Sequence, residues 1–132
     1  MGQPAAKQGD QITATDTHII LVPAPPGPPV PTPIPHPFTG IIDGALSTDV
    51  KIEGRAAATV NSTATNTPPH IPIGGTFAVP PTNRATIIKG SLTVTINGKP
   101  AARSGDIANT CNDPVPLPVG TVVAAGTVMI GG

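Results

Sequence analysis

The sequence predicts a small all-β protein, and three observations lead to this prediction. Small and β-branched residues, mainly Val, Ile, Ala and Thr, dominate the chain, and this composition suits strands. The 132 residues include 19 prolines and 15 glycines, so no window of useful length keeps the 3.6-residue period of an amphipathic helix. A short phrase with alternating apolar residues also recurs along the chain, which is typical of strands with one buried face.

The recurring phrase is clearest in residues 47–60 (STDVKIEGRAAATV) and 91–104 (SLTVTINGKPAARS). Both copies contain a serine, a V-x-I-x-G segment, a basic residue and an Ala-Ala pair. A third copy is divided between the chain ends: residues 126–132 (GTVMIGG) match its first half, and residues 4–10 (PAAKQGD) match its second half. Three copies that close in a circle predict pseudo-three-fold symmetry, with both chain ends in one unit.

Each unit is predicted to form a short β-hairpin. The V-x-I-x-G segment alternates with period two, as a strand with one buried face does. The Glu-Gly-Arg or Gly-Lys-Pro that follows is typical of a turn, and the second half of the unit begins the next strand. Three such hairpins around an axis form one compact domain over residues 1–132.

The segments between the units are rich in proline. Residues 21–40 (LVPAPPGPPVPTPIPHPFTG) form the longest one and are expected to be an extended, polyproline-II-like loop inserted into the body. Residues 71–83 and 113–120 are shorter segments of the same kind. Because each follows the end of a unit, we expect the three loops to emerge at equivalent points of the body.

Composition and charge exclude several classes of protein. The net charge is zero and no basic run occurs, so the chain lacks the electrostatic signature of a nucleic-acid-binding protein. No apolar run approaches the length of a membrane span, and no charged region followed by an apolar stretch marks a secretion signal. The single cysteine excludes an internal disulfide and agrees with synthesis in a reducing cytoplasm.

Three histidines and one cysteine are the candidate metal ligands. His18 and His70 each lie eight residues after the last residue of a unit, and Cys111 lies five residues after one. Symmetry brings equivalent positions together near the axis, so these three side chains are expected to converge. His36, in the longest proline-rich segment, completes a set of four, although a water or another loop group could take its place. Four Cys and His ligands favour a structural zinc ion, which suits a small domain with a thin core.

Catalytic signatures are absent from the sequence. Asp10 and Asp106 could form an acid–base pair, but a Gly-Asp turn whose carboxylate accepts local backbone N–H groups explains them better. No Gly-rich phosphate loop and no G-x-S-x-G motif occurs. We therefore expect a protein that is not an enzyme.

With these motifs the sequence resembles the PAAR-repeat proteins, the tips of type VI secretion and related contractile injection machines. The resemblance covers the whole chain and is strongest at residues 4–10, 47–58, 91–106 and 126–132. The middle copy departs from the motif, because Asn61-Ser62 stands in place of Gly-Asp and Ala56 in place of Pro. This departure makes the geometry of that turn a specific question for the structure.

The resemblance implies a short cone of β-strands. Its broad base binds the end of a trimeric spike protein of the VgrG type, and zinc lies near its point, with iron the less favoured metal. His18, His70 and Cys111 match the metal ligands by repeat position, and His36 joins them as the fourth.

The resulting expectation is a monomeric, non-enzymatic spike tip that contacts the target membrane only transiently. It would be made in the bacterial cytoplasm, assembled on the injection apparatus and delivered outside or into the target cell. One alternative is an adaptor that carries a separate toxin, with residues 21–40 as the attachment. Another is a zinc hydrolase with water as the fourth ligand, for which Asp16 is the only candidate base.

Overall fold

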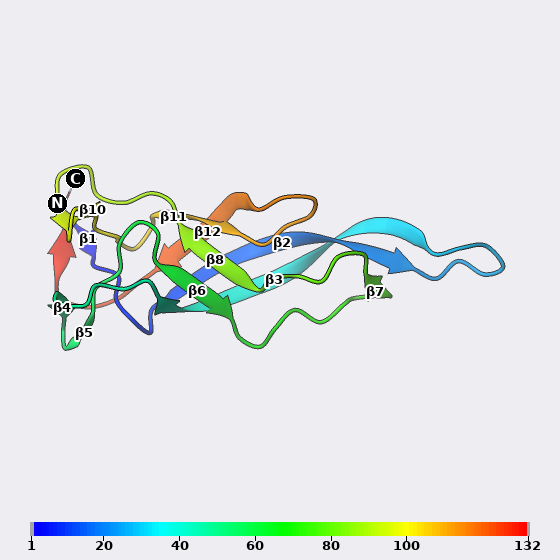
Figure 1. Ribbon diagram of the computed structural model, residues 1–132, viewed down its shortest axis with the longest axis horizontal. Coiled ribbons are helices and arrows are strands. Elements are labelled where there is room, and N and C mark those ends of the chain that lie inside the picture. Colours follow the sequence, from blue (N-terminus) through cyan, green and yellow to red (C-terminus); the bar gives the residue numbers. More distant parts are fainter. Residues whose placement is uncertain (1, 132) are drawn as a thin grey trace.

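The computed structural model describes residues 2–131, which form β-strands and turns and no helix (Figure 1). The predicted all-β class is therefore confirmed, and the described residues contain no helix long and apolar enough to cross a membrane. The strands are β1 (Gln3–Pro4), β2 (Gln11–Val22), β3 (Val30–Gly44), β4 (Lys51–Ile52), β5 (Arg55–Ala56), β6 (Thr63–Asn66), β7 (Thr76–Phe77), β8 (Arg84–Ile87), β9 (Thr95–Ile96), β10 (Lys99–Pro100), β11 (Ile107–Thr110), β12 (Leu117–Val123) and β13 (Met129–Ile130).

Three antiparallel hairpins, β2–β3, β6–β8 and β11–β12, form a closed barrel. Neighbouring hairpins pair through β3–β6 and β8–β11, and β12 pairs back onto β2. Closure leaves no free strand edge within the barrel wall, which protects the wall from pairing with other chains. The loops within the hairpins all leave from the same end of the barrel, as predicted, although residues 117–120 of the third predicted loop belong to β12.

A ring of backbone hydrogen bonds closes the other end of the barrel, which we call the base. Ala6 donates its N–H to the carbonyl of Ala102 (2.9 Å), Ala58 donates to Ala6 (3.1 Å), and Ala102 donates to Ala58 (3.1 Å). The three alanines are equivalent in the three units, and each is fully buried. Only a side chain as small as alanine allows three backbones to approach one axis this closely.

Three two-stranded hairpins surround this ring: β4–β5, β9–β10 and β13–β1. The last of them joins the two ends of the chain, with Gln3 opposite Ile130 and Pro4 opposite Met129. The pairing confirms that the divided copy is one structural unit; its last residue, Gly132, lies outside the described residues.

The Gly-Asp turns explain why the phrase recurs. Asp10 and Asp106 each accept the backbone N–H three residues earlier, at 3.0 and 2.7 Å, and Ser62 does the same in the middle unit at 3.0 Å. Asn61 adopts the positive φ (79°) that glycine supplies in the other two copies, and Asn tolerates this region better than most residues. The departure of the middle copy from the motif therefore leaves the turn intact.

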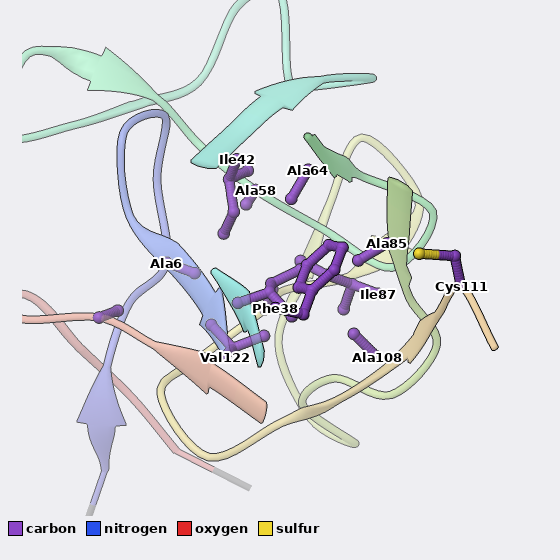
Figure 2. Close-up of a cluster of buried hydrophobic side chains, with 13 residues drawn as sticks. Ala6, Phe38, Ile42, Ala58, Ala64, Ala85, Ile87, Ala108, Cys111 and Val122 are labelled. Atoms are coloured by element: carbon purple, nitrogen blue, oxygen red, sulfur yellow. The ribbon is translucent and has the colours of Figure 1, made fainter. Parts of the chain in front are cut away.

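The barrel interior is filled mainly by alanine, isoleucine and valine, with one large aromatic ring (Figure 2). Phe38 lies in the middle of this cluster and is 1% exposed. A Cβ placed on Gly40 would lie 2.7 Å from the Phe38 ring, so only a residue without a side chain fits in the barrel wall beside this ring. The small interior residues match a body that tapers from the base.

The first hairpin is much longer than the other two and projects beyond the barrel as a needle (Figure 1). β2 has 12 residues and β3 has 15, whereas β6, β8 and β11 have 4 each. The loop expected over residues 21–40 is thus confined to residues 23–29, and the remaining residues are paired strand.

The spacing of the prolines explains how a proline-rich segment forms a strand. Pro31, Pro33, Pro35 and Pro37 occupy alternate positions of β3. Thr39, at the next position of this series, donates its N–H to Asn66 Oδ1 (2.9 Å), on the side away from β2. The nitrogens of the four prolines therefore face away from β2. Because they are not the donors to β2, their lack of N–H groups costs no hydrogen bond within the hairpin. An outer edge without donors also cannot accept another strand.

Candidate metal centre

Five buried polar side chains gather where the barrel ends and the needle begins. Asp16 and His18 lie on β2, and His36 lies on β3. His70 lies in the loop after β6, and Cys111 directly follows β11. Donor atoms of Asp16, His18, His70 and Cys111 all lie within 4.8 Å of one another, so these residues could hold a metal ion.

Strand alternation places these groups inside the molecule. Even-numbered residues of β2 point inward from Ile12 to Ile20. Asp16 and His18 lie within this row. Asp16 stands opposite His36 in the β2–β3 pairing. From the sequence alone, Asp16 was expected only as the base of a hydrolase. Its position two residues before His18, on the same face of the strand, was the signal that it belongs to the cluster.

His18 is oriented by neighbours on both sides of its ring. Its Nε2 lies 3.7 Å from Cys111 Sγ, and its Nδ1 lies 3.5 Å from Asp113 Oδ2. Burial, and next the charge of His70, lower the pKa of His18 below its ordinary value. Because a neutral imidazole is the form that binds a metal, the surroundings of His18 favour its metal-binding form.

His36 lies against the cluster but is not one of the four residues whose donors lie within 4.8 Å. Its ring centroid is 5.5 Å from that of His18 and 5.7 Å from that of His70. Its Nδ1 donates to the carbonyl of Ile34 at 2.8 Å. Its Nε2 is buried and has no hydrogen-bond partner among residues 2–131. A metal ion would provide the partner that the lone pair of this buried nitrogen lacks.

His70 and Cys111 are both held by Asp16. His70 Nε2 lies 2.9 Å from Asp16 Oδ2, and its backbone N–H donates to Asn83 Oδ1 at 2.8 Å. Cys111 Sγ donates to Asp16 Oδ2 at 3.3 Å. Burial, followed by the charge of Asp16, raises the pKa of the Cys111 thiol to about 11. Without a metal the thiol therefore keeps its proton at neutral pH, and metal binding would release it.

The donor set fits a divalent metal of intermediate softness. Imidazole nitrogens and a thiolate are the ligands of structural zinc sites, and the unpartnered Nε2 of His36 provides a buried lone pair. Of the groups with donors within 4.8 Å, none has a side chain open to solvent. A catalytic zinc site keeps an open position for water and substrate, so this closed arrangement is typical of a structural site.

Two aromatic and apolar features border the centre. The Phe77 ring lies 5.7 Å from His18 and 5.6 Å from His36. A groove of about 320 Å³ is lined by one side of His36 and His70 together with prolines and isoleucines, and no carboxylate lines it. Asp16 itself is 0% exposed, already accepts several hydrogen bonds and does not line this groove.

Comparison with known protein families agrees with the geometry. The model of the PAAR motif family matches residues 32–116, which is more than half of the 132-residue chain. The matched part contains His36, His70 and Cys111 and two of the three units. No curated protein matches the sequence. The repeat ring, the closed β-barrel and the family match together show that the chain belongs to the PAAR motif family, the family of contractile-spike tip proteins.

Proposed function

We propose that the chain is the non-enzymatic tip of a contractile injection spike, and that it docks through its base and leads the spike through a target membrane. The distribution of charge supports this proposal. Asp, Glu, Lys and Arg are absent from residues 17–42, 67–83 and 114–123, which build the needle and the loops beside it. The base hairpins, in contrast, carry exposed charges at Lys51, Glu53, Arg55 and Lys99.

A needle without ionised surface groups suits passage through lipid. Burying a charge in hydrocarbon costs several kcal/mol, roughly 2.5–3.5 on insertion scales, so an uncharged surface lowers the barrier. The exposed residues here are prolines with scattered large apolar side chains, including Val30, Ile71 and Val79 at 50%, 72% and 57% exposure. Because the prolines on the outer edge of β3 have no N–H group, this edge has no unpaired donor that would lose its water on entering lipid.

The base has the symmetry of the proposed partner. Three equivalent hairpins surround one axis, which matches the end of a trimeric VgrG-like spike protein. Apolar side chains are exposed on the unit formed by the chain ends, with Val128 at 40% and Met129 at 56%. One chain would therefore cap one trimer and remain monomeric by itself. Synthesis in the cytoplasm and delivery with the spike follow from this role.

Docking is tested by co-expressing the chain with a VgrG-type trimer and measuring the mass of the complex by chromatography with light scattering. The expected complex contains one chain per trimer. Met129→Asp on the base should abolish it, and Val79→Asp, equally exposed but beside the needle, should leave it intact. A complex that survives Met129→Asp and is lost in Val79→Asp would place the docking surface at the other end.

We also propose that the buried centre binds one structural Zn²⁺ through His18, His36, His70 and Cys111. The free Nε2 of His36 supports its place as the fourth ligand. Zinc per chain, measured on protein purified without a histidine tag, should be one, and should fall in His18→Ala, His36→Ala, His70→Ala and Cys111→Ser. Full zinc content in His36→Ala would remove that residue from the set.

A further inference from the structure

Asp16 is a buried carboxylate that the proposed ligand set leaves unused. It is 0% exposed, and its two oxygens face different partners. Oδ2 lies 2.9 Å from His70 Nε2 and 3.3 Å from Cys111 Sγ. Oδ1 accepts a hydrogen bond from Thr110 Oγ1 and another from Asn112 Nδ2 at 3.4 Å. Among the described residues no Lys or Arg forms an ion pair with it, and His70 would balance its charge only if protonated, so a metal cation in the centre would stabilise the carboxylate.

The neighbours of the ring nitrogens indicate which nitrogen of each histidine is available to a metal. In His18, Nδ1 faces the carboxylate of Asp113 while Nε2 faces Cys111. In His36, Nδ1 donates to the carbonyl of Ile34 and Nε2 is free. In His70, Nε2 faces Asp16 and Nδ1 remains. In His36 and His70 one ring nitrogen is therefore committed to an oxygen acceptor, which leaves the other for a metal, as is usual for ligating histidines.

We propose that Asp16 is a positioning carboxylate of the metal centre and not one of the metal's ligands. It accepts the Nε2 proton of His70 and so fixes the tautomer whose Nδ1 carries the lone pair. It also supplies charge: a divalent ion with one thiolate retains one positive charge, and Asp16 makes the buried centre neutral. The inference rests on the proposed metal binding and goes beyond it by assigning a role to a residue outside the ligand set.

The arrangement of its partners explains why Asp16 would stay out of the coordination sphere. Thr110 and Asn112 hold Oδ1 from the side of β11, and His70 approaches Oδ2; these three donors remain when the Cys111 thiol loses its proton to bind a metal. A carboxylate that accepts this many hydrogen bonds is already oriented and is a poor competitor for a position that a free imidazole nitrogen can take.

The test is Asp16→Asn, which keeps the shape of the side chain and removes its charge. Zinc affinity is measured by competition with a chromophoric chelator, and the ligand set is read from the absorption spectrum of the cobalt(II) form. We expect zinc to bind about 10- to 100-fold more weakly, as for other residues that hold metal ligands. The cobalt spectrum should keep its band positions and intensities, because the same ligands remain. Asp43→Asn, an exposed carboxylate on β3, is the matched control and should change neither quantity.

Two results would overturn the inference: unchanged zinc affinity in Asp16→Asn, or a changed cobalt spectrum, which would make Asp16 a ligand. A wild-type protein that binds neither zinc nor cobalt would instead refute the proposed metal site itself, so the two failures are distinguishable. If Asp16→Asn does not fold, Thr110→Val decides the matter, because it removes a donor to Oδ1 and leaves every proposed ligand in place. Its zinc affinity should fall about 10-fold with an unchanged cobalt spectrum, and an unchanged affinity would count against the inference.

Discussion

Phe38 provides the most direct test of how the barrel is held together. The Phe38 side chain fills the space between the three hydrogen-bonded alanines of the base and the metal centre, and Phe38→Ala would leave that space empty. Replacing a buried Phe by Ala costs about 3–5 kcal/mol of unfolding free energy. The neighbours Gly40, Ala64 and Ala85 have little or no side chain to move into the gap, and a closed barrel wall cannot collapse inward. We therefore expect a loss in the upper half of the range, about 4 kcal/mol.

Urea unfolding of the zinc-loaded protein, followed by circular dichroism, measures this loss. Phe77→Ala is the matched control, because the second phenylalanine is only partly buried and packs outside the barrel core. Its cost should be clearly smaller. A Phe38→Ala variant that loses less than about 1.5 kcal/mol would refute the reasoning, since it would mean that the barrel relaxes around the cavity.

Three further predictions concern the edge, the middle turn and the thiol. Pro33→Val combined with Pro35→Val would give the outer edge of β3 two N–H donors, so we expect concentration-dependent self-association in sedimentation velocity; a variant that stays monomeric would show that the prolines do not protect the edge. Asn61→Val should lower the unfolding free energy by about 1–2 kcal/mol in urea, because a β-branched residue is strained at φ 79°, whereas Asn61→Gly should be nearly neutral; equal stability of both would contradict the turn argument. In metal-free protein the raised pKa of Cys111, about 11, keeps most of the thiol protonated below pH 10. Only the thiolate reacts, and its fraction rises about tenfold per pH unit below the pKa, so alkylation by iodoacetamide should accelerate by the same factor between pH 8 and 10. A rate that levels off near pH 9 would show that the thiol is not buried as described.

The sequence by itself determined the fold class and the three-fold plan, and it predicted His18, His36, His70 and Cys111 as metal ligands. Period-two alternation indicates strands without reference to tertiary contacts, because it depends only on which side of a pleated chain is buried. The repeated phrase indicated the symmetry, and the same spacing after a unit singled out His18 and His70, with Cys111 close to it. These features are local or periodic, so they are readable along the chain.

Tertiary structure alone decided the rest. The proline-rich first segment became a paired strand because its prolines fall on the side of β3 that faces away from β2, and this side is defined only once the hairpin has formed. Asp16 entered the centre because β2 points it inward beside groups from two other hairpins. Barrel closure likewise depends on the contact of β12 with β2, two strands at opposite ends of the sequence. Long-range pairing of this kind leaves no periodic trace in a sequence, which is why the strand partners and the full donor set appear only in the folded protein.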